Sequence, residues 1–141
     1  MIAPHFNAEG RRSIGAGLRL LFADGNADVA DSLAMLAIVW GYDARVAYTG
    51  PCALELARRY RPDVVVAGLW LPGLDGYALA QQLQVDLAGT TLIALTGHGQ
   101  PEDRARTREA GFTHHLLKPV EPKDLHLLLT EAAERKHAAT R

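Results

Sequence analysis

The sequence predicts an α/β domain in which a parallel sheet of five strands is covered by helices on both faces. Short runs rich in Val, Ile and Leu alternate with segments of helical periodicity through most of the 141 residues. These runs lack the apolar-polar alternation of half-exposed strands, which is typical of strands buried on both faces. A helical segment follows each of them and can supply the right-handed crossover that parallel strands require.

The composition supports one compact domain and limits its partners. The chain is 48% hydrophobic, enough for a buried core, and its formal net charge is −1. So weak a charge excludes a strong global attraction to nucleic acid or acidic membranes, and we expect neither as a partner. No run of about 18 apolar residues could span a bilayer, and no secretory signal is present, so we expect a cytoplasmic protein. The single cysteine, Cys52, cannot form an internal disulfide.

The first strand-helix unit follows a segment without periodicity. Residues 1–17 are predicted to form a flexible leader. A strand begins at Leu18 in "LRLLFA", and a helix from Ala27 to Trp40 is predicted because its apolar residues recur on one face. Gly41 is expected to end this helix.

The second and third units repeat the pattern. "DARVAY" from Asp43 is a short strand, followed by a helix from Pro51 to Tyr60 with proline in its first turn. "DVVVA" from Asp63 is the third strand, and Tyr77 to Val85 is the third helix.

The last two units complete the domain. "TTLIAL" from Thr90 and "HHLL" from His114 are the fourth and fifth strands. Helices are predicted from Pro101 to Ala110 and from Pro122 to about Arg135.

The five units place the domain at residues 18–136, with a short tail at 137–141. Sheets of this kind hold their functional residues at the carboxyl ends of the strands. The loops at that edge are expected to begin at Asp24, Gly68, Thr96 and Lys118.

Four segments resemble the receiver domain of two-component response regulators. They are "LRLLFADGNADVADSLAML", "RPDVVVAGLWLPGLDGYALA", "LIALTGHGQPEDRARTREAGF" and "HHLLKPV", in the family's order. The resemblance covers about Leu18 to Ala133 and implies a flavodoxin-like fold with strand order 2-1-3-4-5. It also implies a signalling role, since receivers accept a phosphoryl group from a histidine kinase, and we expect no enzymatic activity.

The resemblance identifies a phosphorylation pocket that lacks two of its side chains. Asp24, Thr96 and Lys118 match the first member of an acidic pair, the hydroxyl residue and the lysine of a typical receiver. Gly25 stands at the second acidic position, and Gly68 stands where the family has its phospho-acceptor Asp. Glycine supplies neither a nucleophile nor a metal ligand, so we expect no cofactor and weak or absent Mg²⁺ binding.

Other carboxylates are poor substitutes for the acceptor. Asp63 begins the third strand and should lie at the opposite end of the sheet, and Asp75 is predicted to cap the third helix. We expect Lys118 to pair with Asp24, because a charge at a crowded strand edge needs a partner, and Thr96 to bond backbone.

Two further residues are candidates for a role at the pocket. His115 stands where receivers often carry a switch aromatic, and its neighbour His114 should face the other side of the strand, so the two do not form a chelate. Trp70 lies in the loop after Gly68, where it either covers the space that the glycines leave or contacts a partner.

These observations favour a pseudo-receiver that acts by phosphorylation-independent protein interaction. Met35, Ile38 and Leu127 point away from the predicted core and form a possible partner surface. The expected partners are a histidine kinase, a phosphotransfer protein, a second receiver or a second copy of the chain. Phosphorylation through an unusual residue, and an acceptor site altered by substitution, are the alternatives. A flavin or nucleotide binder is disfavoured because "ADGNAD" lacks a glycine-rich phosphate turn.

Overall fold

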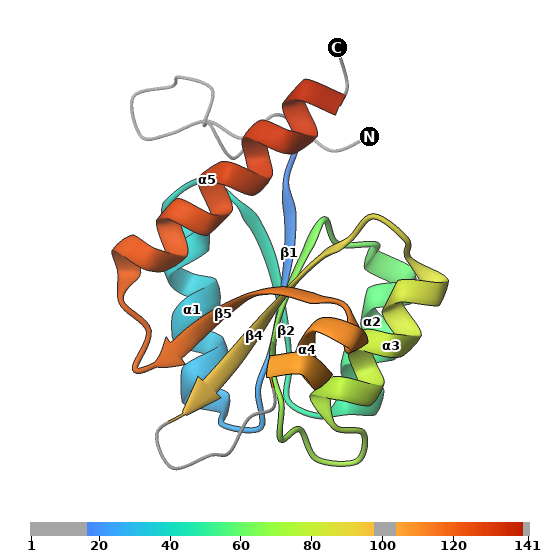
Figure 1. The fold of residues 1–141 in the computed structure, drawn as a ribbon. Coiled ribbons are helices and arrows are strands. Elements are labelled where there is room, and N and C mark those ends of the chain that lie inside the picture. Colours follow the sequence, from blue (N-terminus) through green and yellow to red (C-terminus); the bar gives the residue numbers. More distant parts are fainter. Residues whose placement is uncertain (1–16, 98–103, 140–141) are drawn as a thin grey trace.

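A computed structural model describes residues 17–97 and 104–139, in which strands and helices alternate without exception (Figure 1). The strands are β1 (Arg19–Ala23), β2 (Asp43–Ala47), β3 (Val64–Gly68), β4 (Thr91–Gly97) and β5 (Phe112–Lys118). The helices are α1 (Ala27–Val39), α2 (Gly50–Tyr60), α3 (Gly76–Asp86), α4 (Arg104–Ala110) and α5 (Pro122–Ala139). None of the helices in the described part of the chain has the length and hydrophobicity that a membrane span requires.

The five strands form one parallel sheet in the order β2-β1-β3-β4-β5. Both the parallel pairing and the strand order are therefore confirmed. The central strand β3 is buried along its whole length, as its unbroken run of apolar residues predicts. Strand β2 lies at one edge of the sheet and β5 at the other.

Helices cover both faces of the sheet, and each face has its own core. Figure 1 shows α1 and α5 on one face and α2, α3 and α4 on the other. Alternate residues of a strand enter different cores, so Phe22 packs with α1 and α5 whereas Leu21 packs with α2 and α3. This arrangement leaves the loops at the ends of the strands free to form a site.

The helix starts follow from capping side chains. Asn26 caps α1, Thr49 caps α2, and Asp75 caps α3 by accepting a hydrogen bond from the backbone N–H of Ala78 at 2.9 Å. The cap predicted for Asp75 is confirmed. The capping residues place each helix start beside the carboxyl end of a strand.

Most element boundaries differ from the sequence prediction by one residue, and two strand boundaries differ by two. Strand β5 begins at Phe112, two residues before His114, because Phe112 pairs with Leu92 across the sheet. Strand β4 continues to Gly97, where it pairs with Lys118. Residues 101–103 of the predicted fourth helix lie outside the described residues, as do residues 1–16 of the predicted leader.

Helix α5 continues to Ala139, so the predicted tail is helical at residues 137–139. A tertiary contact accounts for the extra turn. The ammonium of Lys136 lies 2.9 Å from Oδ2 of Asp63 and 2.6 Å from the carbonyl oxygen of Gly17. These bonds tie the end of α5 to the starts of β1 and β3, which local periodicity cannot reveal.

Candidate functional site

Asp24 and Lys118 form an ion pair between the ends of β1 and β5. The ammonium of Lys118 lies 2.8 Å from Oδ2 of Asp24, whose side chain is 5% exposed. The other carboxylate oxygen, Oδ1, accepts a hydrogen bond from the backbone N–H of Asn26 at 2.8 Å. Both oxygens of this buried carboxylate are therefore bonded, and the pairing predicted for Lys118 is confirmed.

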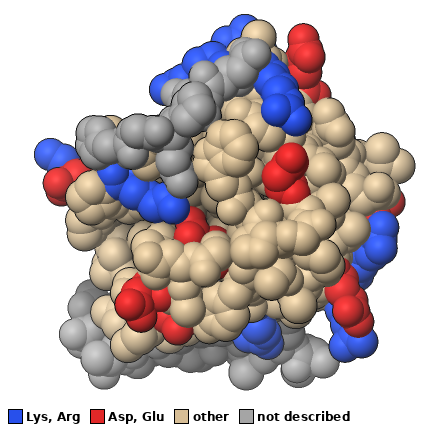
Figure 2. All heavy atoms as spheres, turned by 90° about the horizontal axis from the view of Figure 1, so that it is seen from below, with Lys and Arg blue, Asp and Glu red and all other residues tan. Residues whose placement is uncertain are grey.

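A cavity of about 300 Å³ opens above this ion pair. Its lining comes from the ends of β1, β3 and β5, which confirms that these loops share one edge of the sheet. The lining residues are Asp24, Gly25, Asn26, Gly68, Leu69, Trp70 and Lys118. Figure 2 views the molecule from below, and outside its grey atoms Lys and Arg are interspersed with Asp and Glu on that face.

The two glycines of the cavity are not required by the backbone. Both Gly25 and Gly68 lie outside the left-handed region, which favours glycine. A Cβ on Gly25 would lie 3.1 Å from Cδ of Pro72, a tight contact that a small shift relieves. A Cβ on Gly68 would lie 3.0 Å from Oδ2 of Asp24. The Asp24 carboxylate therefore abuts the position where a side chain on residue 68 would begin.

Gly76 shows the contrasting case of a glycine that packing requires. A Cβ there would overlap the carbonyl oxygen of Gly68 and would lie 2.7 Å from Cα of Leu69. The start of α3 can approach the end of β3 only because residue 76 has no side chain.

The polar groups of the cavity do not fit a divalent cation. Asp24 is the one carboxylate among its lining residues, and both of its oxygens already accept hydrogen bonds. Mg²⁺ takes six oxygen ligands in near-octahedral geometry. Across residues 17–97 and 104–139, no group of three or more His, Cys, Asp or Glu side chains is placed to hold a metal. No chemical step is therefore assigned to a metal at this site.

Thr96 lies beside the cavity but does not line it. Its side chain is buried near the end of β4, and its partner in the β5 register is Leu117. Gly68 pairs with Leu95, so Thr96 is one residue farther along the neighbouring strand. The structure thus places Thr96 at the predicted edge of the sheet.

Trp70 forms part of the cavity wall while 52% of its surface stays exposed. Both roles expected of it are compatible with this position, because the residue lines the cavity and about half of its surface is exposed. An exposed tryptophan next to a cavity is a common anchor for a binding partner.

His115 contacts α4 rather than the cavity. Its Nε2 lies 3.0 Å from the hydroxyl oxygen of Thr107, which is fully buried. Because that hydroxyl donates its hydrogen to the carbonyl oxygen of Arg104, Nε2 of His115 must donate to Thr107. His114 instead contacts the hydroxyl of Thr113 through Nδ1, so the two imidazoles have different partners.

The alternative acceptors lie away from the cavity. Oδ2 of Asp63 accepts hydrogen bonds from the N–H of Arg19 and from Lys136, both at the opposite end of the sheet. Asp75 is engaged in the cap of α3. Both sequence-based assignments agree with the structure.

The predicted partner surface is exposed on α1 and α5, which cover the same face of the sheet (Figure 1). Met35, Ile38 and Leu127 are 67%, 54% and 58% exposed. Between these helices the rings of Trp40 and His126 meet edge to face, with centroids 4.8 Å apart. The surface is apolar and accessible from solvent.

Sequence reasoning did not identify two residues that shape the site. Asn26 supplies the N–H that holds Oδ1 of Asp24 and also caps α1. The available signal was an Asn just before a helical segment with an acid in its first turn. Leu69 lines the cavity through its place after β3, for which no local signal exists.

Comparison with known proteins places this arrangement in a family. The family model of the response regulator receiver domain matches residues 20–130 of this chain. The DNA-binding response regulator MtrA of Mycolicibacterium paratuberculosis is 33% identical over 107 residues, which cover 76% of this chain and 47% of MtrA. The probable transcriptional regulator ycf27 of Porphyridium aerugineum is 30% identical over 122 residues, 86% of this chain and 50% of ycf27. The chain thus spans about half the length of these curated relatives.

Solved structures share the fold. The REC domain of AraT, a response regulator from Geobacillus stearothermophilus, has a TM-score of 0.80 and 26% identity, and the match covers 88% of this chain and 98% of that one. A putative response regulator from Chloroflexus aurantiacus has a TM-score of 0.75 and 28% identity, over 83% of this chain and 98% of that one.

Proposed function

Because the chain belongs to the response regulator receiver domain family, we propose that it is a pseudo-receiver that signals by protein interaction without accepting a phosphoryl group. One observation carries the proposal. Gly68 ends β3 and offers no nucleophile, and the resemblance to the family assigns the acceptor Asp to this position. The module would belong to a two-component system and would act as a binding partner.

The remaining carboxylate of the cavity is poorly suited to replace the acceptor. An acyl phosphate forms when a free carboxylate oxygen attacks phosphorus. Oδ2 of Asp24 is held by Lys118, and Oδ1 is held by the N–H of Asn26. Attack through Oδ2 would first have to break an ion pair that is largely excluded from water, which opposes the reaction.

The charge of the cavity also opposes phosphoryl transfer. The transferred group carries negative charge on its equatorial oxygens, which metal ions and cationic side chains neutralise in phosphoryl-transfer sites. Here the donor set does not fit Mg²⁺, and the charge of Lys118 is already balanced by Asp24. A phosphoryl group would therefore find no net positive charge from these two side chains.

The module would bind its partner through the apolar surface of α1 and α5. Met35, Ile38 and Leu127 give this surface exposed aliphatic side chains, and α1 is rigidly packed on the sheet through Leu33 and Ala37. A histidine kinase, a phosphotransfer protein or a second receiver is the partner class that the family supports. The name of MtrA states that it binds DNA, but this chain matches only 47% of that protein. We therefore propose no DNA binding for this chain.

The proposal is tested by intact mass measurement after incubation with acetyl phosphate and Mg²⁺. The native chain is expected to keep its mass. The double variant Gly25→Asp with Gly68→Asp restores both carboxylates and is expected to gain one phosphoryl group, since neither position needs glycine for its backbone. The double alanine variant adds the same Cβ atoms without carboxylates and serves as the matched control. A stoichiometric mass gain in the native chain, mapped to Asp24, would instead support phosphorylation through an unusual residue.

A further inference from the structure

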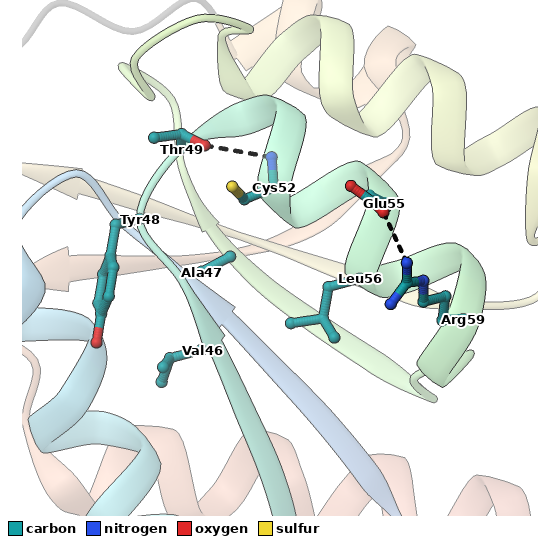
Figure 3. Close-up of a pocket in the computed structure, with 8 residues that line it drawn as sticks. All are labelled: Val46, Ala47, Tyr48, Thr49, Cys52, Glu55, Leu56 and Arg59. Atoms are coloured by element: carbon teal, nitrogen blue, oxygen red, sulfur yellow. Dashed lines mark hydrogen bonds and ion pairs between the residues drawn. The ribbon is translucent and has the colours of Figure 1, made fainter.

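We draw no further inference here: the strongest candidate, the mostly apolar cleft of about 390 Å³ between the end of β2 and helix α2 (Figure 3), carries no proposal because nothing in the structure shows what covers it.

Discussion

Lys118 forms an ion pair with Asp24, and its ammonium nitrogen lies 2.8 Å from Oδ2 of that carboxylate. The pair joins the last residue of β5 to the residue after β1, two strands that are not neighbours in the sheet. Oδ2 of Asp24 also lies 3.0 Å from the position of a Cβ on Gly68. The ion pair therefore lies against the space where a side chain on residue 68 would begin, and its two charges balance each other.

Lys118→Met is expected to destabilise the fold by about 2 kcal/mol. Removing one partner of a buried pair leaves an uncompensated charge, typically at a cost of 3–5 kcal/mol, but here Asn26 still bonds Asp24 and Lys118 is partly exposed. Adding Asp24→Asn to this variant removes the stranded charge and should recover part of the loss. Urea unfolding gives the free energy of unfolding of the native chain, of Lys118→Met and of the double variant. If the double variant is no more stable than Lys118→Met, the unpaired charge of Asp24 is not the cause of the lost stability.

Glycine at residue 25 is expected to be replaceable, in contrast to glycine at residue 50. A Cβ on Gly50 would overlap the carbonyl oxygen of Leu74, which is backbone and cannot move aside, so Gly50→Ala should cost roughly 2 kcal/mol or more. Gly25→Ala meets only the ring of Pro72 and should change stability by less than about 1 kcal/mol. Thermal and urea unfolding compare the two. Equal losses would show that the backbone needs glycine at residue 25 and would contradict this prediction.

The sequence predicted the elements well because their signals are local. Buried strands such as β3 are continuous apolar runs, and Asp75 stands just before a helical period. The Asp24–Lys118 pair was predictable once the carboxyl ends of the strands were placed at one edge, since a buried charge needs a partner.

Contacts between distant residues account for what the sequence did not predict. The extra turn of α5 depends on Lys136 meeting Asp63, and the position of His115 depends on Thr107 of α4. The cavity between the end of β2 and α2 arises from the spacing between an edge strand and a helix, which periodicity does not encode. Such features depend on packing geometry and require a structure.

Stability is expected to fall at alkaline pH, partly through Tyr60. Burial, followed by the charge of Asp43, raises the pKa of Tyr60 above its ordinary value of 10.0. Below pH 10 the phenol is neutral in both states and its contribution is complete; as the pH rises further, the unfolded chain loses the proton first and the contribution is progressively lost. Tyr60→Phe should therefore show a shallower fall in unfolding free energy above about pH 10 than the native chain. Identical slopes in urea unfolding at several pH values would contradict this.

The surface of α1 and α5 is expected to be the surface of self-association if a second copy is the partner. Ile38→Asp places a charge among Met35 and its exposed neighbours and should abolish the concentration-dependent dimer in sedimentation velocity. Val85→Asp is the matched control, because Val85 is a similarly exposed aliphatic residue on α3, across the sheet. A native chain that stays monomeric at all concentrations, or an equal loss in both variants, would contradict a homodimer through this surface.

The most direct test of the pseudo-receiver assignment is the two-dimensional ¹H–¹⁵N NMR spectrum of the native chain, recorded with and without acetyl phosphate and Mg²⁺. The backbone amides of Gly25, Gly68 and Trp70 report on any group that enters the cavity, and the amide of Lys118 reports on the ion pair. Our account predicts that these signals keep their positions, because the cavity has no free nucleophile and no metal-binding donor set. A second set of signals for these residues, appearing only with the phosphodonor and Mg²⁺ together, would contradict it.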